Sequence, residues 1–400
     1  MRILFCIFFL SLGYSGFAQK RQQIQYSASA NSQGTSDAVI VDDVPLIHTT
    51  QFLPIDNIGG IIGKGDVIAQ FNQVFSNISF ALKNAGSNLD QIVKLNIYLR
   101  NSNSVPAVLQ EISKMFKAGK SPALSFVTGN LSHTDALISA DAIAVSVKIN
   151  PESVKYFMPQ NLSSNVGFAR SAILPAGPAV YVSGQAVKGE LAEATRATLE
   201  QLITTLVSLG LEKKDIVQIK SFIRPMSDLQ VVEQEFANFF KGANIPPMVN
   251  VEWTSKDPVI EIELIASSPV TGARSSQQLD FITPPGMSAS PVYCRVVRIN
   301  YGQKIFISSL YGQKTEDADY ELSTIFSSLG TILKKTGSDF SHLVKATYYV
   351  SNDDHSAKLN EIRPKYYDPL RPPAASKAMV KDVGKSQAGI SMDMIGVVIK

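Results

Sequence analysis

The side chains that most often bind metals are few and scattered in this 400-residue chain. It contains two cysteines and four histidines: Cys6, Cys294, His48, His133, His342 and His355. Metal-ligand motifs need such residues at short, regular spacings, and disulfide frameworks need more cysteines. We therefore expect no metal site, no cofactor and no disulfide framework. Cys294 lies in a predicted strand, where a lone thiol usually behaves as a small apolar residue.

Two other familiar motifs are incomplete. Gly59-Gly-Ile-Ile-Gly-Lys64 resembles a phosphate-binding loop, but Gly65 follows it in place of Ser or Thr and no strand leads into it. No Gly-x-Ser-x-Gly segment is present, so a serine-hydrolase nucleophile has no elbow to occupy. The sequence predicts neither a nucleotide phosphate site nor a hydrolase triad.

Carboxylates near the ends of three β-rich segments are the more promising groups. Strand alternation places Glu261 and Glu263 on one face of the same predicted strand. Asp141, Glu263 and Asp393 recur at matching places, which favours a structural role such as pairing between copies. Glu261 is either a solvated neighbour of Glu263 or a working carboxylate in a partly closed cleft.

These segments belong to a threefold internal repeat. Taking Gly86, Gly210 and Gly337 as references, apolar residues precede each glycine by eleven, eight and four positions. They are Phe75, Ile78 and Leu82; Leu199, Leu202 and Leu206; and Phe326, Leu329 and Leu333. This spacing predicts an amphipathic helix that ends just before a capping glycine.

Further markers follow each glycine at constant distances. A valine stands seven residues on and opens a β-rich run, and a proline stands thirty-six residues on. They are Val93, Val217 and Val344, and Pro122, Pro246 and Pro373. The chain is therefore three copies of a unit of roughly 125 residues.

Each unit is predicted to contain strand, strand, helix, strand, helix, strand, strand. In the second copy the later elements are expected at Ala179–Ser183, Ala192–Leu209, Val217–Ile223, Asp228–Phe240, Val249–Trp253 and Val259–Ala266. Alternating strands and helices indicate an α+β fold with helices on one face of a mixed sheet. We place the domains at 36–149, 165–268 and 288–400.

The N-terminus has the order of a secretory signal peptide. Arg2 precedes an apolar run from Ile3 to Leu12, and small residues lead to Ala18. We expect cleavage after residue 18, a polar tail at 19–35 and a periplasmic or secreted mature protein, with no membrane contact after cleavage. Hydrophobic content of 45% and charged content of 18% are typical of folded protein. A net charge of +3, falling to +2 without Arg2, and the lack of a basic run argue against nucleic-acid binding.

The second copy resembles the RidA/YjgF (Rid, enamine/imine deaminase-like) family. The residues that carry this resemblance are Val180-Tyr-Val-Ser-Gly-Gln185, Phe239-Phe240 and Ile260-Glu-Ile-Glu-Leu-Ile-Ala266, with Leu46-Ile-His-Thr-Thr-Gln51 and Tyr293-Cys-Arg-Val-Val297 as echoes in the other copies. The resemblance covers residues from about Ser36 to the C-terminus. It implies a chorismate-mutase-like α+β fold that forms homotrimers with ligand clefts between subunits. Three tandem copies would then pack as an intramolecular pseudo-trimer, and we expect a monomer in solution.

The resemblance also implies a catalytic pair that this chain keeps only in part. The family's substrate-binding Arg corresponds to Leu124, Met248 and Ala375, so it is missing in all three copies. The family's Glu, which helps to activate water, corresponds to Ser139, Glu261 and Ser391. We therefore expect Glu261 to be the catalytic residue, if the chain has one.

Other family positions give candidate ligand-binding residues. They are Phe168, Arg170, Ser183, Gly184, Tyr293, Arg295 and Asn360. The Ser183-Gly184 turn is matched to Thr49-Thr50 in copy one and to Ser308-Ser309 in copy three, and Asn360 is matched to Leu109 and Glu233. Arg170 and Arg295 could equally be surface or inter-copy ion-pair residues. We expect Glu261, Ser183-Gly184, Phe168 and Arg170 to form one cleft, the functional one.

Three functions remain open from the sequence. The first is binding of small imine, carbonyl or carboxylate metabolites in the clefts between copies. The second is enamine/imine deamination, the hydrolysis of 2-iminoacids to keto acids and ammonia, with Arg170 or Arg295 in place of the missing Arg. The third is a structural or protein-interaction module whose clefts are filled.

Overall fold

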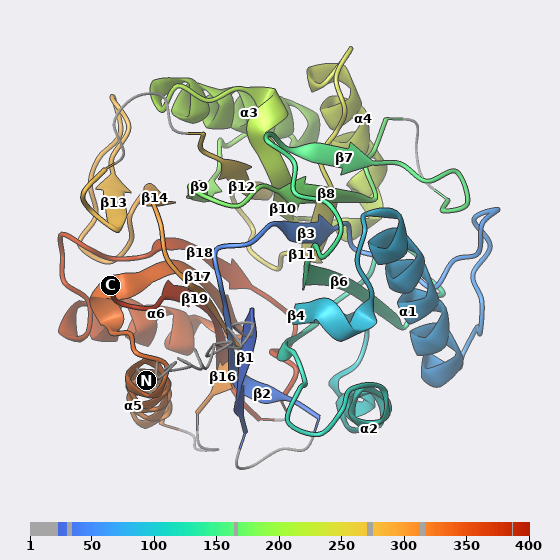
Figure 1. Cartoon of the computed structure of the whole chain (residues 1–400), viewed down its shortest axis with the longest axis horizontal. Coiled ribbons are helices and arrows are strands. Elements are labelled where there is room, and N and C mark those ends of the chain that lie inside the picture. The colour runs from blue at the N-terminus through green and yellow to red at the C-terminus, as the bar shows by residue number, and fades with distance from the viewer. Residues whose placement is uncertain (1–22, 30–33, 164–166, 270–274, 313–316, 386) are drawn as a thin grey trace, which may run out of the picture.

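The computed structural model describes residues 23–29, 34–163, 167–269, 275–312, 317–385 and 387–400. Within these residues the chain forms three β-sheets, with helices on the outside of the molecule (Figure 1). The predicted signal peptide, residues 1–18, lies outside the described part. No helix of the described residues is long and apolar enough to cross a membrane.

Each repeat supplies two helices and the centre of one sheet. The sheet of repeat one contains, in order, β5 (Ala123–Thr128), β4 (Ile92–Leu99), β6 (Ile138–Val145), β3 (Leu46–Thr49), β8 (Ser171–Leu174) and β7 (Lys155–Phe157). The sheet of repeat two contains β11 (Met248–Glu252), β10 (Ile216–Ile223), β12 (Ile260–Ser267), β9 (Ala179–Gln185), β14 (Val296–Ile299) and β13 (Leu279–Ile282). The sheet of repeat three contains β18 (Ala374–Met379), β17 (Leu343–Val350), β19 (Ile390–Val397), β15 (Lys304–Ile307), β2 (Ser36–Val41) and β1 (Ile24–Ala28), with β16 (Leu310–Tyr311) also paired to β19.

The helices follow the same repeat. They are α1 (Val67–Asn84) and α2 (Val105–Met115), α3 (Leu191–Ser208) and α4 (Leu229–Phe239), and α5 (Ala318–Lys335) and α6 (Asp353–Ile362). Short 3-10 turns stand at Leu89–Gln91, Ser102–Ser104, Lys213–Asp215, Met226–Asp228, Phe340–His342 and Arg363–Lys365. The three-copy α+β fold is confirmed, and the elements of repeat two lie within two residues of their predicted bounds.

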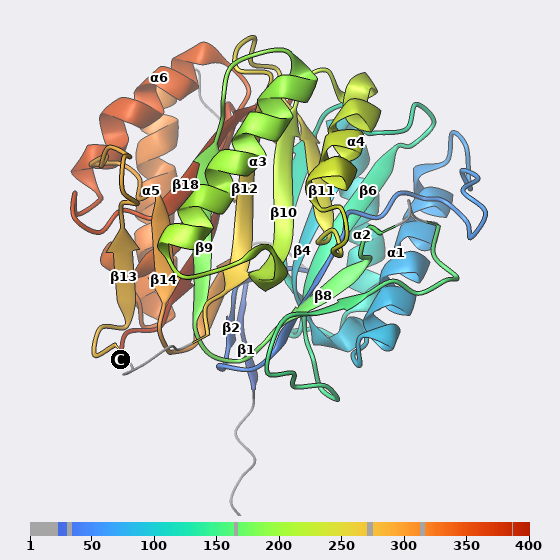
Figure 2. The ribbon, with the colours of Figure 1, turned by 90° about the horizontal axis from the view of Figure 1, so that it is seen from above.

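The helices cover the outer face of each sheet (Figure 2). The nine apolar helix residues that revealed the repeat are all buried in the three helix-side cores. The reference glycines cap the helices as predicted, because Gly86, Gly210 and Gly337 all have positive φ, between 74° and 82°.

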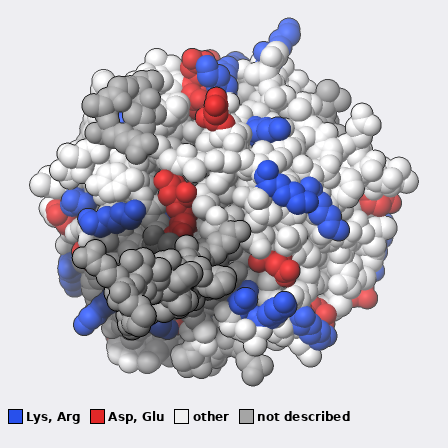
Figure 3. Space-filling view, in the orientation of Figure 1, with Lys and Arg blue, Asp and Glu red and all other residues white. Residues whose placement is uncertain are grey.

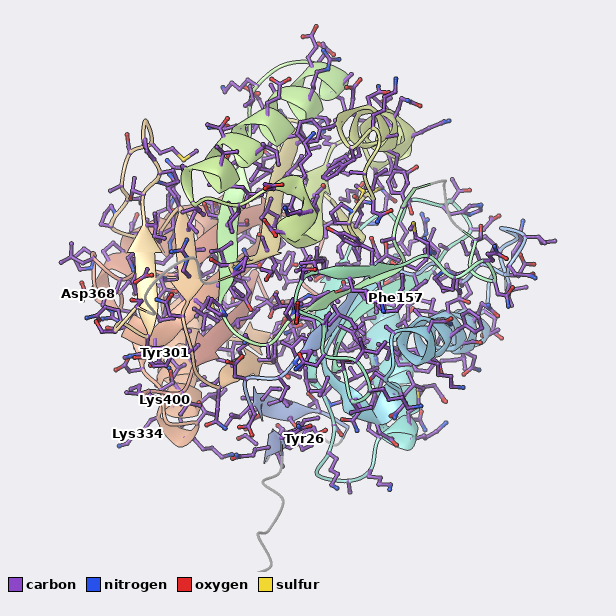
Figure 4. The ribbon with its side chains drawn as sticks, turned by 45° about the horizontal axis from the view of Figure 1, so that its top comes forward. Tyr26, Phe157, Tyr301, Lys334, Asp368 and Lys400 are labelled. Carbon is purple, nitrogen blue, oxygen red and sulfur yellow. The ribbon has the colours of Figure 1, made fainter. Side chains whose placement is uncertain are left out.

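The two strands at one edge of each sheet come from a different part of the chain. Hairpin β7–β8 leads into repeat two but pairs with β3 of repeat one. Hairpin β13–β14 leads into repeat three but pairs with β9 of repeat two. The N-terminal hairpin β1–β2 completes the sheet of repeat three through β15. Tyr26, Phe157 and Tyr301, labelled in Figure 4, mark β1, β7 and the turn after β14. At one edge, each sheet is therefore completed by a hairpin that leads into another repeat.

The segment expected as a polar tail is ordered in part. Ile24–Ala28 forms β1, which is antiparallel to β2. The structure differs from the prediction here because Ile24 and Tyr26 pack against an apolar cluster that all three sheets share.

The inner faces of the three sheets meet around a common core. Val93, Val217 and Val344 are buried there together, and each is the residue at which the register of its strand shifts. Such a shift turns both the valine and the next residue inward, so Lys94, Gln218 and Lys345 line a small cavity of about 50 Å³. The three recurrent valines thus mark the place in each strand where the copies contact one another.

The recurrent carboxylates pair with lysines of neighbouring repeats in this inner layer. Lys94 Nζ lies 2.6 Å from Asp393, and Lys345 Nζ lies 2.5 Å from Glu263. Asp141 accepts hydrogen bonds from its own repeat, and Lys220 of repeat two acts on it electrostatically. Burial raises the pKa of Asp141, and Lys220 opposes this shift. Each repeat therefore contributes both signs of charge to a closed ring of interactions.

Candidate functional site

The contact region of repeats two and three around Glu261 is named here the Glu261 cleft. It is built on Ser183 and Gly184, near the end of β9, where the register with β12 shifts. The Ser183 amide donates to the Arg295 carbonyl at 2.9 Å, and the Gly184 amide donates to Ser376 Oγ at 3.1 Å. Ser376 lies on β18, so this part of β9 is held against the edge strand of repeat three.

Glu261 lies directly against Gly184. A β-carbon at position 184 would overlap the Glu261 carboxylate, so Glu261 can hold this position only beside a glycine. Glu261 Oε1 is buried and has no hydrogen-bond partner among the described residues. Burial and the nearby Glu263 raise the pKa of Glu261 to about 7, against the opposing effects of Ser376, Lys345 and Lys377. A carboxyl that titrates near neutrality can give or take a proton in a reaction.

Lys377 brings a cation to this cleft. It lies on β18 two residues after Ala375, the position of the missing Arg, so both side chains point to the same face of the strand. Its Nζ lies 3.4 Å from Asn360 Oδ1. Burial and Arg363 lower the pKa of Lys377, while Glu261 raises it. The sequence analysis missed Lys377, although the period of two along a strand was the signal that could have found it.

Asn360 is part of the same network. Arg363 Nη2 donates to Asn360 Oδ1 at 2.5 Å, so Asn360 stands between two cations. Arg363 itself is buried and lies 5.2 Å from the Tyr348 ring. The predicted residues Glu261, Ser183, Gly184 and Asn360 are thus linked through Ser376 and Lys377.

Tyr293 and Arg295 also border this cleft, but their side chains face each other. The Arg295 guanidinium lies 4.9 Å from the centre of the Tyr293 ring, and Nε donates to the Ser288 carbonyl at 3.2 Å. The Arg295 backbone holds the Ser183 turn, as described above. Its guanidinium is not among the cations that lower the pKa of Glu261, which are Lys345 and Lys377.

Phe168 and Arg170 lie in a different cleft, between repeats one and two. They line a cavity of about 220 Å³ together with Gln51, Glu233 and Met248, among others. The expectation that they join Glu261 is wrong. The reason is the strand exchange: β8, which follows Arg170, belongs to the sheet of repeat one.

Arg170 is largely enclosed in that cavity. Its guanidinium lies 4.9 Å from the centre of the Phe52 ring, and its Nε has no hydrogen-bond partner among the described residues. Burial lowers the pKa of Arg170 to about 10, and Glu233 opposes the shift.

The turn of repeat one is shifted by one residue from its predicted position. The Thr50 amide donates to the Arg170 carbonyl, as Ser183 does to Arg295, so Thr50-Gln51 and not Thr49-Thr50 matches Ser183-Gly184. In repeat one, the Gln51 side chain occupies the space that has no side chain at Gly184 in repeat two. Its Nε2 donates to Ser139 at 2.8 Å, and its Oε1 accepts from the Asn250 amide at 2.9 Å.

The described residues were also compared with what a metal site or a nucleic-acid surface would require. In the described residues no three His, Cys, Asp or Glu side chains come together as a metal site would require. Positive and negative side chains alternate over the face in Figure 3 without a broad patch of one sign.

Comparisons with known proteins agree with this architecture. The sequence model of the family described as endoribonuclease L-PSP matches residues 29–146, 159–268 and 290–398. A RutC family protein of Pyrococcus abyssi is 36% identical over 92 residues, which are 23% of this chain and 72% of that protein. The 3-aminoacrylate deaminase RutC of Acinetobacter baylyi is 30% identical over 99 residues, 25% of this chain and 78% of the relative.

Solved structures are also similar to part of this chain. A Rid family protein of Yersinia pestis is 21% identical and covers 31% of this chain and 99% of its own, with a TM-score of 0.28. A YjgF family protein of Neisseria meningitidis is 18% identical and covers 30% of this chain and 96% of its own, with a TM-score of 0.24. The three matches of the family model span most of the chain, and the chain therefore belongs to the RidA/YjgF family, whose model is described as endoribonuclease L-PSP, as three tandem copies.

Proposed function

We propose that this protein is exported and binds a small carboxylate-bearing carbonyl, imine or enamine metabolite in the Glu261 cleft, with hydrolysis as a residual activity. The observation that carries the proposal is the contact of Glu261 with Gly184 beside Lys377. A proton-exchanging carboxyl and a cation side by side suit a ligand that has an ionised carboxylate next to a basic nitrogen or a carbonyl oxygen. The order of Arg2, the apolar run and Ala18 supports export.

Lys377 would hold the ligand carboxylate in place of the family's Arg. An ammonium is a point charge on a flexible chain, whereas a guanidinium binds a carboxylate through two parallel hydrogen bonds. The substitution keeps the attraction but loses the fixed orientation of the substrate. Binding would therefore suffer less than turnover, which depends on orientation.

Hydrolysis of an imine needs one proton donor and one water. Protonated Glu261 would give its proton to the imine nitrogen while water adds to the imine carbon. Of the two protons of the added water, one returns to Glu261 and the other goes to the leaving nitrogen, and cleavage of the carbon–nitrogen bond then gives a keto acid and ammonia. The name of the relative RutC, a 3-aminoacrylate deaminase, supports this reaction class.

The test is a 2-iminoacid hydrolysis assay beside the RutC deaminase at equal protein concentration. We expect turnover at least tenfold lower, because one missing Arg–carboxylate fork is worth roughly 1.5–3 kcal/mol. Lys377→Met should lower the remaining rate further, whereas Arg295→Met, whose guanidinium faces Tyr293, should not. Turnover equal to that of RutC would contradict a residual activity.

For the two clefts other than the Glu261 cleft, the alternative to ligand binding is a structural role. Open volume at these interfaces favours ligand binding over a scaffold, since a scaffold would be expected to fill its clefts with side chains. The cavity beside Arg170 measures about 220 Å³, and the cavity between repeats three and one measures about 730 Å³.

A further inference from the structure

Ser376 lies where the Glu261 cleft meets the ionic layer inside the molecule. Its side chain is buried, and its Oγ accepts from the Gly184 amide at 3.1 Å and donates to Glu263 Oε2. Gly184 is also the residue whose β-carbon would overlap the Glu261 carboxylate. One hydroxyl group of repeat three therefore lies between two carboxylates of repeat two.

The carboxylate of Glu263 is held by a charged partner. Lys345 Nζ lies 2.5 Å from Glu263 Oε2, and both side chains are only 7% exposed. A buried ion pair is stable only while both charges are present. An ionised carboxylate accepts hydrogen bonds and has none to donate, so Glu263 can only take the proton of the Ser376 hydroxyl.

Glu261 has no such fixed partner. Its Oε1 is buried and makes no hydrogen bond within the described residues. The charged groups that act on it are Glu263 on its own strand, Lys345 on β17 and Lys377 on β18. β10 places Phe222 opposite Glu261 and β9 places a glycine there, so neither strand adds a charge. When Glu261 ionises, it gains a hydrogen bond only from a group that can turn toward it.

The Ser376 hydroxyl is such a group. A serine hydroxyl carries one proton and rotates about its carbon–oxygen bond, so it can donate to one carboxylate or to the other. A hydrogen bond donated to a carboxylate favours the ionised form. The side chain of Ser376 accordingly lowers the pKa of Glu261, against the larger effect of burial.

The other two interfaces between repeats lack this combination of a hydroxyl and a carboxylate. The matching residues are Ser125 and Ser391 between repeats three and one, and Val249 and Ser139 between repeats one and two. Ser125 accepts from Lys94 Nζ at 2.7 Å, so this hydroxyl also lies beside a buried lysine, but without a carboxylate in the position of Glu261. Ser125 is therefore a natural control for Ser376.

We infer that Ser376 is a positioning residue for Glu261, whose hydroxyl donates to Glu263 while Glu261 is protonated and turns to Glu261 when that carboxyl gives up its proton. The ion pair of Lys345 and Glu263 holds the hydroxyl in the first position and keeps Glu263 satisfied in the second. The inference rests on the proposed function, because it describes how the acid–base group of the Glu261 cleft is prepared. The buried interface of repeats two and three thus takes part in the chemistry of the cleft.

The experiment follows the Glu261 carboxyl carbon by NMR through a pH titration of the full-length mature protein without ligand. Glu261→Gln assigns the signal. Ser376→Ala should raise the titration midpoint by about one pH unit, a tenfold change in the ionisation equilibrium. Ser376→Thr keeps the hydroxyl and should restore the midpoint of the wild type. Ser125→Ala should leave the midpoint unchanged.

Ser376→Cys guards against a folding defect in the alanine variant. It fills nearly the same space with a weaker donor, so it should also raise the midpoint. A midpoint that is unchanged or lower in the folded Ala and Cys variants, or that rises equally in Ser125→Ala, would overturn the inference. Because no ligand is present, a raised midpoint supports the inference even if the iminoacid assay refutes the proposed function.

Discussion

At the scale of single residues, the three repeats differ most where the turn meets the last strand. Repeat two combines Gly184 with Glu261, whereas repeat one combines Gln51 with Ser139, and Ser309 and Ser391 take these places in repeat three. The carboxylate is present only where a glycine leaves room for it. Because a residue without a β-carbon stands beside a carboxylate only in repeat two, we expect acid–base chemistry in the Glu261 cleft and not in the other two.

The first prediction concerns that pairing. Gly184→Ala places a β-carbon on the Glu261 carboxylate, and overpacking of this kind costs roughly 1–3 kcal/mol of unfolding free energy. Gly184→Ala combined with Glu261→Ser should recover most of the loss, because repeats one and three carry serine at that position. Chemical denaturation of the two variants measures the difference. Equal stability of Gly184→Ala and wild type would refute the close contact.

Some site residues could be predicted from the sequence and others could not. Glu261, Gly184 and Asn360 were found because they occupy positions of a recognised pattern. Lys377 was missed because the pattern has no cation at that position, and only strand geometry relates it to Ala375. Phe168 and Arg170 were assigned to the wrong cleft because their neighbours are set by which sheet β8 joins.

At the scale of elements, the sequence predicts the helices and their ends correctly, but it does not predict which strands pair across the repeats. Helix faces and capping glycines follow from the order of residues within one turn or two, so they could be read directly. The exchanged hairpins could not, because a short strand has the same alternation whichever sheet edge it joins. β1 is a clear example, since its five residues are mostly polar and only Ile24 and Tyr26 reach the shared core.

The second prediction concerns the buried ion pair of Lys94, on the inner face of β4, with Asp393. Lys94 and Asp393 have side chains that are 3% and 10% exposed, so removing one charge leaves the other buried and unpaired. Lys94→Met should lower the unfolding free energy by roughly 3–5 kcal/mol, and Lys94→Met with Asp393→Leu should restore much of it. Thermal and denaturant unfolding of both variants provides the check. A neutral single variant would mean that this pair does not join repeats one and three.

At the scale of the whole molecule, the three repeats close on one another. Hairpins β7–β8 and β13–β14 each join the sheet of the preceding repeat, and β1–β2 joins the last sheet, so a single chain completes the ring of strand exchanges. Covalent linkage supplies the partners at high effective concentration.

A third prediction follows: light scattering of the protein purified from its native source should give the mass of one chain, and mass spectrometry should find an N-terminus near Gln19. A stable particle of three chains, or an intact Met1, would contradict this account.

The most direct test of the proposed function is a calorimetric titration with pyruvate at pH 6 and pH 8. With a pKa of about 7, Glu261 is mostly neutral at pH 6 and mostly anionic at pH 8, where it repels the ligand and competes for Lys377. Binding should therefore be roughly tenfold tighter at pH 6. Glu261→Gln should remove this pH dependence and bind at pH 8 as the wild type does at pH 6.

In the same titration, Lys377→Met should weaken binding at least tenfold at both pH values, while Lys385→Met, in the cavity between repeats three and one, should have no effect. An identical pH dependence in wild type and Glu261→Gln, together with full affinity in Lys377→Met, would show that pyruvate does not bind in the Glu261 cleft.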